Sequence, residues 1–268
     1  MKRTEQRNPN SMNLDKMNAL EIATCINNED KFVALAVEKA LPEIAKTIEM
    51  VVSSFNKGGR LLFIGAGTSG RLGILDATEC PPTYGEPPEK VVGIIAGGES
   101  AVFRASENAE DIGEKGVEDV KKANICEKDT LIGVSVAGDA KYVYDAIVYA
   151  NSVGANTSAL TCNYDAKIVQ VAKVAIVTDT GAEVVTGSTR MKAGTAHKMV
   201  LNMISTGAMV LTGHVVENHM VNMNPNNIKL KERAARIISD IAKISIEQAR
   251  EEVATGLSIK EVLAKYVK

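Results

Sequence analysis

The sequence predicts an α/β fold built on a doubly wound, parallel, five-stranded sheet in a three-layer sandwich. Five short apolar segments alternate with helical patterns between residues 60 and 181, as expected for parallel strands joined by helical crossovers. These segments are apolar almost throughout, which is typical of strands buried on both faces. With 268 residues, 45% of them apolar, the chain is long enough to bury one large core.

Helices are expected before the sheet. Residues 1–14 are polar and predict an extended arm, and Asn13 and Asp15 are candidate N-caps for a first helix. A second helix is predicted over residues 31–55, where apolar side chains recur at helical spacing. Glycines at 58–59 are expected to end it, because glycine readily adopts the backbone conformation that terminates helices.

The strands and their connecting helices follow in alternation. The five strands are expected over residues 60–67, 91–98, 130–138, 155–163 and 173–181. The helices between them are expected over residues 69–76, 100–123, 141–153 and 165–171. Ligands bind at the carboxyl ends of the strands in such open sheets, so residues just after each strand are the first candidates for a site.

The last part of the chain is predicted to be helical. From Gly187 onward the alternation stops, and residues 191–211 predict one long buried helix. Two amphipathic helices are expected after it, over residues 228–243 and 245–267, with a chain break at NPNN (224–227) and a helix break at Gly256. These patterns predict three parts: an N-terminal arm with helices (1–56), an α/β domain (57–220) and a C-terminal helical unit (221–268).

Composition and charge argue against several classes of function. The formal net charge of −2 and the pI near 6.0 disfavour general electrostatic binding to nucleic acid or to an anionic membrane. The lack of Trp and the low aromatic content disfavour stacking on single-stranded nucleic acid. No apolar run reaches the roughly 18 residues of a membrane helix. The polar start of the chain lacks the apolar core of a signal peptide, so a cytoplasmic location is expected.

The cysteines and histidines predict neither a disulfide framework nor a metal site. The four cysteines lie far apart in the sequence and form no CxxC pair. The three histidines lie near no cysteine cluster, so a metal centre has no support. These residues are Cys25, Cys80, Cys126, Cys162, His197, His214 and His219.

A glycine-rich turn follows the first predicted strand, with the sequence GAGTSGR over residues 65–71. Its glycines allow backbone amides to approach an anion, and Thr68 and Ser69 add hydroxyl donors at the start of a helix. The segment also fits the dinucleotide fingerprint, but the required acid about 20 residues later is missing. A nucleotide P-loop lacks its G-K-[ST] ending here, and a tight turn without a ligand is a further alternative.

Two sets of carboxylates follow strands of the same predicted sheet. Asp76 and Glu79 come after the glycine turn, and the prolines at 81–82 are expected to end that helix directly beyond Glu79. Glu107 and Glu110 are three residues apart, so they are expected to share one helix face. Two carboxylates in different environments suit proton abstraction at one atom and proton delivery at another. The alternative is that they are solvated surface charges among the 33 acidic residues.

Several long segments resemble the N-acetylmuramic acid 6-phosphate etherase family. They are FIGAGTSGRLGILDATECPPTYG (63–85), VVGIIAGGESA (91–101), NAED (108–111), residues 181–209 and the arm with the first helix (4–31). The resemblance extends over about residues 4–236. It implies the sugar isomerase fold and a cofactor-independent carbon–oxygen lyase that acts on a phosphorylated amino sugar.

The resemblance also implies the reaction and its residues. A base removes the C2 proton of the ring-opened sugar, lactate leaves from C3, and water adds to give N-acetylglucosamine 6-phosphate and D-lactate. Glu79 and Glu110 are the implied pair, with Glu79 as acid and Glu110 as base, in sites formed between the two subunits of a homodimer. The implied substrate-binding residues are Gly67, Thr68, Ser69, Ser135, Gly138, Glu107, Ser188 and Lys192.

One loop departs from that family. Where the etherases carry Ala-Ser-Gly-Arg-Thr-Pro-Tyr, this chain has VAGDAKY over residues 136–142, so two hydroxyls are lost and Asp139 replaces the arginine. Three compensations stay open: Asp139 turned away as a helix N-cap, a charge from Lys141, or an anion held by Ser135, Thr68 and Ser69. The altered loop favours a rival hypothesis, a non-catalytic sugar-phosphate sensor on the same fold. A phosphosugar isomerase is a third hypothesis, disfavoured by the ECPP and NAED matches.

Overall fold

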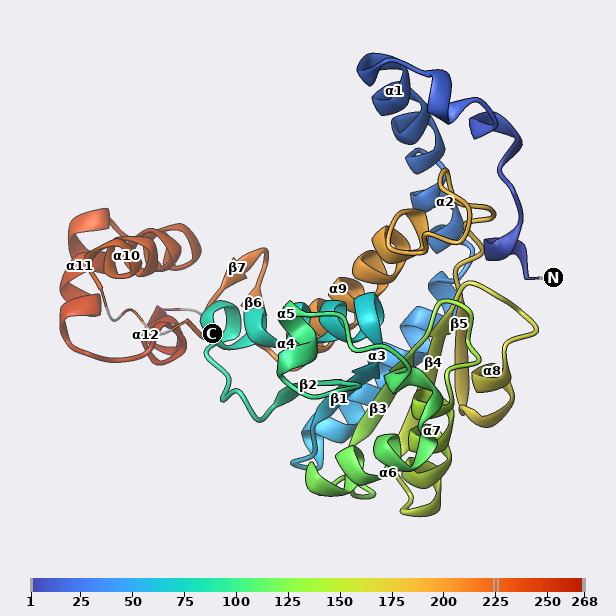
Figure 1. Ribbon diagram of the computed structural model, residues 1–268. Coiled ribbons are helices and arrows are strands. Elements are labelled where there is room, and N and C mark those ends of the chain that lie inside the picture. The colour runs from blue at the N-terminus through green and yellow to red at the C-terminus, as the bar shows by residue number, and fades with distance from the viewer. Residues whose placement is uncertain (1, 224, 226, 267–268) are drawn as a thin grey trace. The chain divides into compact units, whose positions relative to one another are not determined.

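The structure is a computed structural model that describes residues 2–223, 225 and 227–266 (Figure 1). The chain forms two compact units, Met1–Thr78 with Glu89–Ala208, and Glu79–Pro88 with Met209–Lys268. The division into parts that the sequence suggests, at residues 56 and 220, stays a prediction. Two residues of the expected NPNN break and the expected helix end at 267 lie outside the described residues.

The first unit contains the predicted five-stranded sheet. Its strands are β1 (Leu61–Gly65), β2 (Val91–Ile95), β3 (Thr130–Val134), β4 (Asn156–Thr161) and β5 (Val174–Val177). They are all parallel, in the order β2-β1-β3-β4-β5, which confirms the predicted α/β fold. The chain therefore runs from β1 outward to β2 and then crosses back to β3 on the other side of β1.

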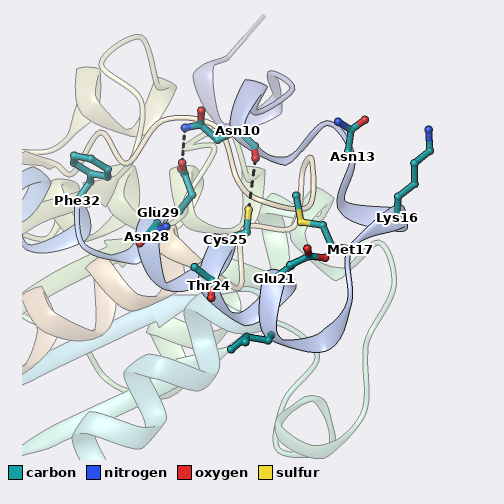
Figure 2. A pocket seen from close by; sticks show the side chains of 11 residues that line it. Asn10, Asn13, Lys16, Met17, Glu21, Thr24, Cys25, Asn28, Glu29 and Phe32 are labelled. Carbon is teal, nitrogen blue, oxygen red and sulfur yellow. Dashed lines mark hydrogen bonds between the residues drawn. The ribbon is translucent and has the colours of Figure 1, made fainter.

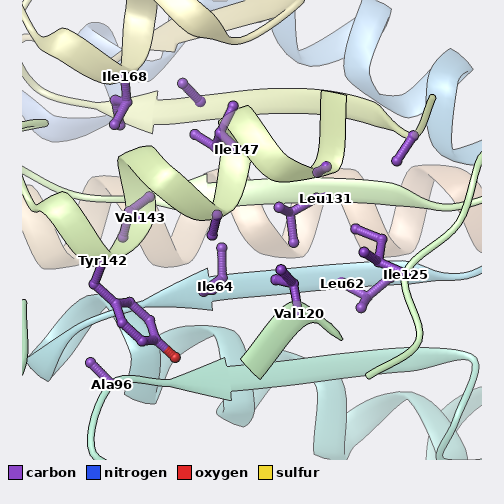
Figure 3. Packing of buried hydrophobic residues seen from close by; sticks show 14 of the residues in the cluster. Leu62, Ile64, Ala96, Val120, Ile125, Leu131, Tyr142, Val143, Ile147 and Ile168 are labelled. Atoms are coloured by element: carbon purple, nitrogen blue, oxygen red, sulfur yellow. The ribbon is translucent and has the colours of Figure 1, made fainter. Parts of the chain in front are cut away.

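Helices cover both faces of this sheet. On one face, α6 (Gly113–Lys122) and α7 (Lys141–Ser152) bury Leu62 and Leu131 against Ile147, as Figure 3 shows. On the other face lies α3 (Leu41–Asn56), whose buried Ser54 hydroxyl lies 2.8 Å from the Thr130 hydroxyl of β3. Successive strand side chains point to opposite faces, so β3 supplies both contacts, and the three-layer prediction is confirmed.

Two of the expected helices are broken. The predicted helix over 31–55 is α2 (Val33–Glu38) followed by α3, because the chain turns at Lys39 and Ala40. The predicted helix over 100–123 is α5 (Ser100–Phe103), a 3₁₀ turn η4 (Ala109–Asp111) and α6. Asn108 has a φ of 60°, a left-handed conformation that ends helices and that asparagine tolerates. Glu107 and Glu110 therefore do not share a helix face, contrary to the prediction.

The helix after the glycine turn is longer than predicted. It is α4 (Gly67–Tyr84), and it continues through Pro81 and Pro82 instead of ending before them. Proline fixes φ near −65°, which is a helical value, so the helix extends over Pro81 and Pro82 although neither residue has an amide donor. The Gly85 amide then donates to the Pro81 carbonyl at 2.9 Å. Glu79 consequently lies within α4 and not at its end.

The arm before the sheet consists of short 3₁₀ turns, η1 (Arg3–Glu5), η2 (Pro9–Ser11) and η3 (Leu14–Lys16), followed by α1 (Ala19–Asp30). The predicted caps of the first helix are wrong. Asn18 is the N-cap instead, and it exchanges hydrogen bonds with Glu21 in a capping box. Cap chemistry of this kind needs the acid three residues after the cap, a spacing that neither Asn13 nor Asp15 has.

The remaining helices mostly follow the prediction. They are α8 (Lys167–Val171), α9 (Lys192–Leu211), α10 (Ile228–Ala242), α11 (Ile246–Ala254) and α12 (Ile259–Tyr266). Gly256, at a φ of 81°, separates α11 from α12 as expected. A short hairpin of β6 (Val215–Val216) and β7 (His219–Met220) was not predicted. In the part of the chain that the structure describes, every helix is too short or too polar to cross a membrane.

Candidate functional site

A cavity of about 410 Å³ lies at the carboxyl ends of β1 and β3. Its walls are the loops after these two strands, η4 and single residues from more distant segments. In a sheet of this strand order, β1 and β3 flank the point where the direction of winding reverses, and open α/β sheets bind ligands there. Five of the predicted site residues line it: Gly67, Thr68, Ser69, Ser135 and Glu110.

The glycine turn forms one wall of this cavity, and its backbone requires glycine at two positions. Gly67, the first residue of α4, has a φ of 54°. A side chain at Gly70 would come within 2.7 Å of the Gly65 carbonyl oxygen, so α4 packs directly on β1. The Ser69 and Gly70 amides donate to the Ala66 carbonyl at 3.1 and 3.4 Å, and the N-terminus of α4 lies at the cavity wall, as does the start of α7 next to Ala140. Two helix N-termini favour an anion in this cavity.

A second cavity, of about 400 Å³, shares Ala66, Gly67 and Glu110 with the first. Glu107 also lines it, so the two glutamates meet at one site although the helix predicted to join them is broken. Arg71 lies in the same wall, and its Nε donates to the Val102 carbonyl at 2.8 Å. Glu110 therefore lies between the first cavity, where the helix N-termini favour an anion, and the second cavity, which Glu107 also lines.

Four predicted residues lie outside the walls of both cavities: Gly138, Ser188, Glu79 and Lys192. The Gly138 amide donates to the Ser135 hydroxyl at 3.1 Å, so Gly138 stabilises the loop after β3 without lining the cavity. Ser188 is half-buried beside Thr189, which does line the first cavity. Glu79 is exposed on α4 and belongs to the second compact unit.

Lys192 is engaged elsewhere. Its Nζ forms a buried ion pair with Glu29, at 2.6 Å, and the amides of Asn8 and Asn10 donate to the same carboxylate, as Figure 2 shows for Asn10. Burial raises the pKa of Glu29, but the lysine and the two amides lower it more, so the pKa lies below its ordinary value. Lys192 thus joins the arm and α1 to α9.

We expect Lys192→Met to lower the free energy of unfolding by about 3 kcal/mol at pH 7, because Glu29 would keep a buried charge without its cation. The Michaelis constant of the folded variant should change little. Since the pKa of Glu29 is lowered, the stabilisation is complete above its ordinary value of 4.5 and is lost as the pH falls below it. Urea unfolding at pH 7 and at decreasing pH would measure this. A variant as stable as the wild type but with a tenfold higher KM would contradict this prediction and indicate that Lys192 binds substrate.

Asp139 does not cap the helix after its loop. The N-cap position of α7 is Ala140, which makes no side-chain cap bond. Asp139 instead accepts a hydrogen bond from the backbone amide of Lys167 at 3.3 Å and forms an ion pair with Lys2. The first of the three compensations considered for this loop is therefore wrong, although Asp139 still lines the first cavity.

Several residues of these walls were not predicted as site residues, among them Glu5, Arg71, Asp111 and Thr189. Arg71 is the last residue of the glycine-rich segment and Thr189 directly follows the predicted Ser188, so proximity in sequence was an available signal. Glu5 comes from the arm, and nothing in its local sequence points to the cavity. Among the described residues, no three His, Cys, Asp or Glu side chains gather in a way that could hold a metal ion.

A wider hollow of about 800 Å³ lies between the arm and α1 (Figure 2). Its two carboxylates both have structural partners: Glu21 bonds the Asn18 amide in the capping box, and Glu29 pairs with Lys192. This hollow therefore offers no acid–base pair, and the two smaller cavities are the candidate site.

Known proteins resemble this chain in sequence and in fold. A family model described as the glucokinase regulatory protein N-terminal SIS domain matches residues 43–151. An N-acetylmuramic acid 6-phosphate etherase of Photorhabdus laumondii is 51% identical over 251 residues, which are 94% of this chain and 83% of that protein. One of Actinobacillus pleuropneumoniae is 54% identical over 237 residues, 88% of this chain and 78% of that protein.

Two solved phosphoheptose isomerases share the fold. The one from Neisseria gonorrhoeae has a TM-score of 0.54 at 16% identity and covers 71% of this chain and 99% of its own. The one from Francisella tularensis has a TM-score of 0.54 at 18% identity, with 72% and 98% covered. Identities this low show the sugar isomerase fold alone, whereas identity above one half over most of both sequences shows the family: the chain belongs to the N-acetylmuramic acid 6-phosphate etherases.

Proposed function

We propose that this protein cleaves the lactyl ether of N-acetylmuramic acid 6-phosphate, giving N-acetylglucosamine 6-phosphate and D-lactate. The relatives that are 51–54% identical over most of the chain carry the name of this activity. The position of Glu110 supports it most directly, because Glu110 lines both cavities. A ring-opened sugar with its phosphate among Thr68, Ser69 and Ser135 would occupy the same cavity as that carboxylate.

Glu110 acts as the base in this proposal. It takes the proton from C2 of the ring-opened sugar, the C3–O electrons leave with the lactyl oxygen, and Glu79 delivers a proton to that oxygen. Water then adds at C3 while a proton returns to C2, so neither an oxidant nor a reductant is needed. Glu79 is exposed, and we propose that it serves the site of a second copy in a homodimer.

The substrate contacts proposed are Gly67, Thr68, Ser69, Ser135 and Glu107, with Gly138 and Ser188 supporting the loops that carry them. Lys192 is the weakest of the candidates because Glu29 occupies its ammonium group. A cytoplasmic location is also proposed, since none of the four cysteines forms a disulfide.

A sugar-phosphate sensor is the second candidate function. It is favoured by the altered loop and by the first cavity, whose lining contains four carboxylates but neither Lys nor Arg. The similarity to the regulatory-protein model extends over residues 43–151 alone, whereas the similarity to the etherases extends over most of the chain. The etherase is therefore the better-supported function.

Lactate release from N-acetylmuramic acid 6-phosphate by the purified protein tests this proposal. We expect release in a buffer with a metal chelator and without added nucleotide, and we expect it to be lost in Glu79→Gln and in Glu110→Gln. Folded wild-type protein that binds the sugar phosphate but releases no lactate would favour the sensor.

A further inference from the structure

The first cavity has an excess of negative charge for a phosphate site. Glu5, Glu110, Asp111 and Asp139 line it, and its lining includes neither Lys nor Arg. Like charges within a few ångströms disfavour one another, and a sugar phosphate carries up to two negative charges. The two helix N-termini at the cavity offset only part of this repulsion, because each corresponds to about half a positive charge.

One cation reaches this loop from the other end of the sequence. The Lys2 ammonium lies 2.5 Å from the Asp139 carboxylate and also donates to the carbonyl of Ala137 in the same loop. The other carboxylate oxygen of Asp139 accepts from the Lys167 amide. Burial raises the pKa of Asp139, yet Lys2 and the Lys167 amide lower it more, so the carboxylate stays charged and needs its counter-ion.

The arm holds Lys2 in this place. Thr4 is fully buried, and its hydroxyl accepts a hydrogen bond from the Asn163 side chain at 3.4 Å. Farther along, the Ser11 hydroxyl donates to the Val184 carbonyl at 2.7 Å. The Lys2 side chain is itself only 18% exposed. The contact with Asp139 is therefore part of a packed segment.

We propose that Lys2 is a specificity-determining residue: it neutralises Asp139, so that the loop at residues 136–142 does not repel the phosphate of the ligand. The cation beside this loop thus comes from a distant segment of the same chain, whereas the etherases carry an arginine within the loop. This inference rests on the proposed function only in its choice of ligand class, a phosphorylated amino sugar. The inference requires that substitution of Lys2 weaken binding through the phosphate of the ligand and not through its lactyl group.

Calorimetry with N-acetylglucosamine 6-phosphate tests this without turnover. We expect Lys2→Met to raise the Kd about tenfold, which corresponds to one lost charge contact. Adding Asp139→Ser to Lys2→Met should return the Kd to within about threefold of the wild type, because the unpaired acid is then gone. Arg3→Gln is the matched control, since it breaks the neighbouring arm contact with Asp179 and should leave the Kd unchanged.

Kinetics with N-acetylmuramic acid 6-phosphate give a second readout. Lys2→Met should raise KM while kcat stays within about twofold, because repulsion by the unpaired Asp139 would act on the phosphate, away from the reacting carbons. Binding of sugar phosphate without lactate release by the wild type would defeat the etherase but leave this inference standing. An unchanged Kd in Lys2→Met would overturn it. So would a raised Kd that Asp139→Ser fails to restore, because loss of the arm packing would then be the cause.

Discussion

Glu110→Gln is expected to lower kcat for lactate release by about 10²- to 10⁴-fold, the usual contribution of a general base. Glutamine has nearly the same size as glutamate but cannot accept the C2 proton. The fold should be unchanged, because Glu110 is an exposed residue of η4. Circular dichroism and the thermal midpoint would verify folding, and a coupled lactate assay would measure kcat.

Solvent isotope exchange separates the two glutamates. In deuterated water, the wild type should exchange the C2 proton, and Glu110→Gln should lose this exchange together with lactate release. Glu79→Gln should keep the exchange while losing release, because the acid acts only when the C3–O bond breaks. Glu114→Gln, at an exposed position in the first turn of α6, is the matched control and should behave like the wild type. Undiminished turnover in Glu110→Gln would contradict the assignment.

The strands were predictable because burial on both faces leaves a continuous apolar run that local sequence records. β1 and β3 are completely buried, and both lie inside predicted segments. The helix breaks were not predictable in the same way. Helical spacing of apolar residues continues through Lys39 and Ala40, so the pattern does not record the turn between α2 and α3. A single left-handed residue, Asn108, is likewise invisible to periodicity.

The candidate site was predictable where its chemistry is local. The glycine turn at Gly67–Ser69 has its strand, its turn and its helix in adjacent residues, so the sequence contains the whole motif. Contacts between residues that are far apart in the sequence were not predicted. Lys192 lies within the matched segment 181–209, but its ammonium pairs with Glu29, which is 163 positions away. Lys2 reaches Asp139 from the arm, and no spacing rule connects such distant positions.

Asp129→Ala is expected to cause the largest loss of stability, roughly 3–5 kcal/mol in the free energy of unfolding. The Asp129 side chain is 1% exposed and forms an ion pair with Arg60 at 2.7 Å. It also accepts hydrogen bonds from the backbone amides of Arg60 and Cys126. Alanine would leave the guanidinium and both amides without this partner, and unpaired buried donors cost about 1–3 kcal/mol each.

The position of Asp129 separates this effect from catalysis. Asp129 directly precedes β3, and its backbone carbonyl accepts a hydrogen bond from the Asn156 amide at the start of β4. Asp129 therefore joins the amino ends of β3 and β4. The candidate site lies at the carboxyl ends of the strands, and kcat per folded molecule should therefore stay unchanged. We expect the thermal midpoint to fall by roughly 8–15 °C. Asp129→Asn should fall less, because it keeps one accepting oxygen.

A surface ion pair of the same length provides the control for this experiment. Glu118 and Lys115 are also 2.7 Å apart, but both are exposed on α6. Glu118→Ala should leave the thermal midpoint unchanged, because solvent screens an exposed pair and ordering two long side chains offsets its attraction. The two pairs share their separation, so a difference between the two variants reports the burial of Asp129 and its additional hydrogen bonds. If Asp129→Ala melted with the wild type, the amino ends of β1, β3 and β4 would be held by apolar packing and backbone hydrogen bonds alone.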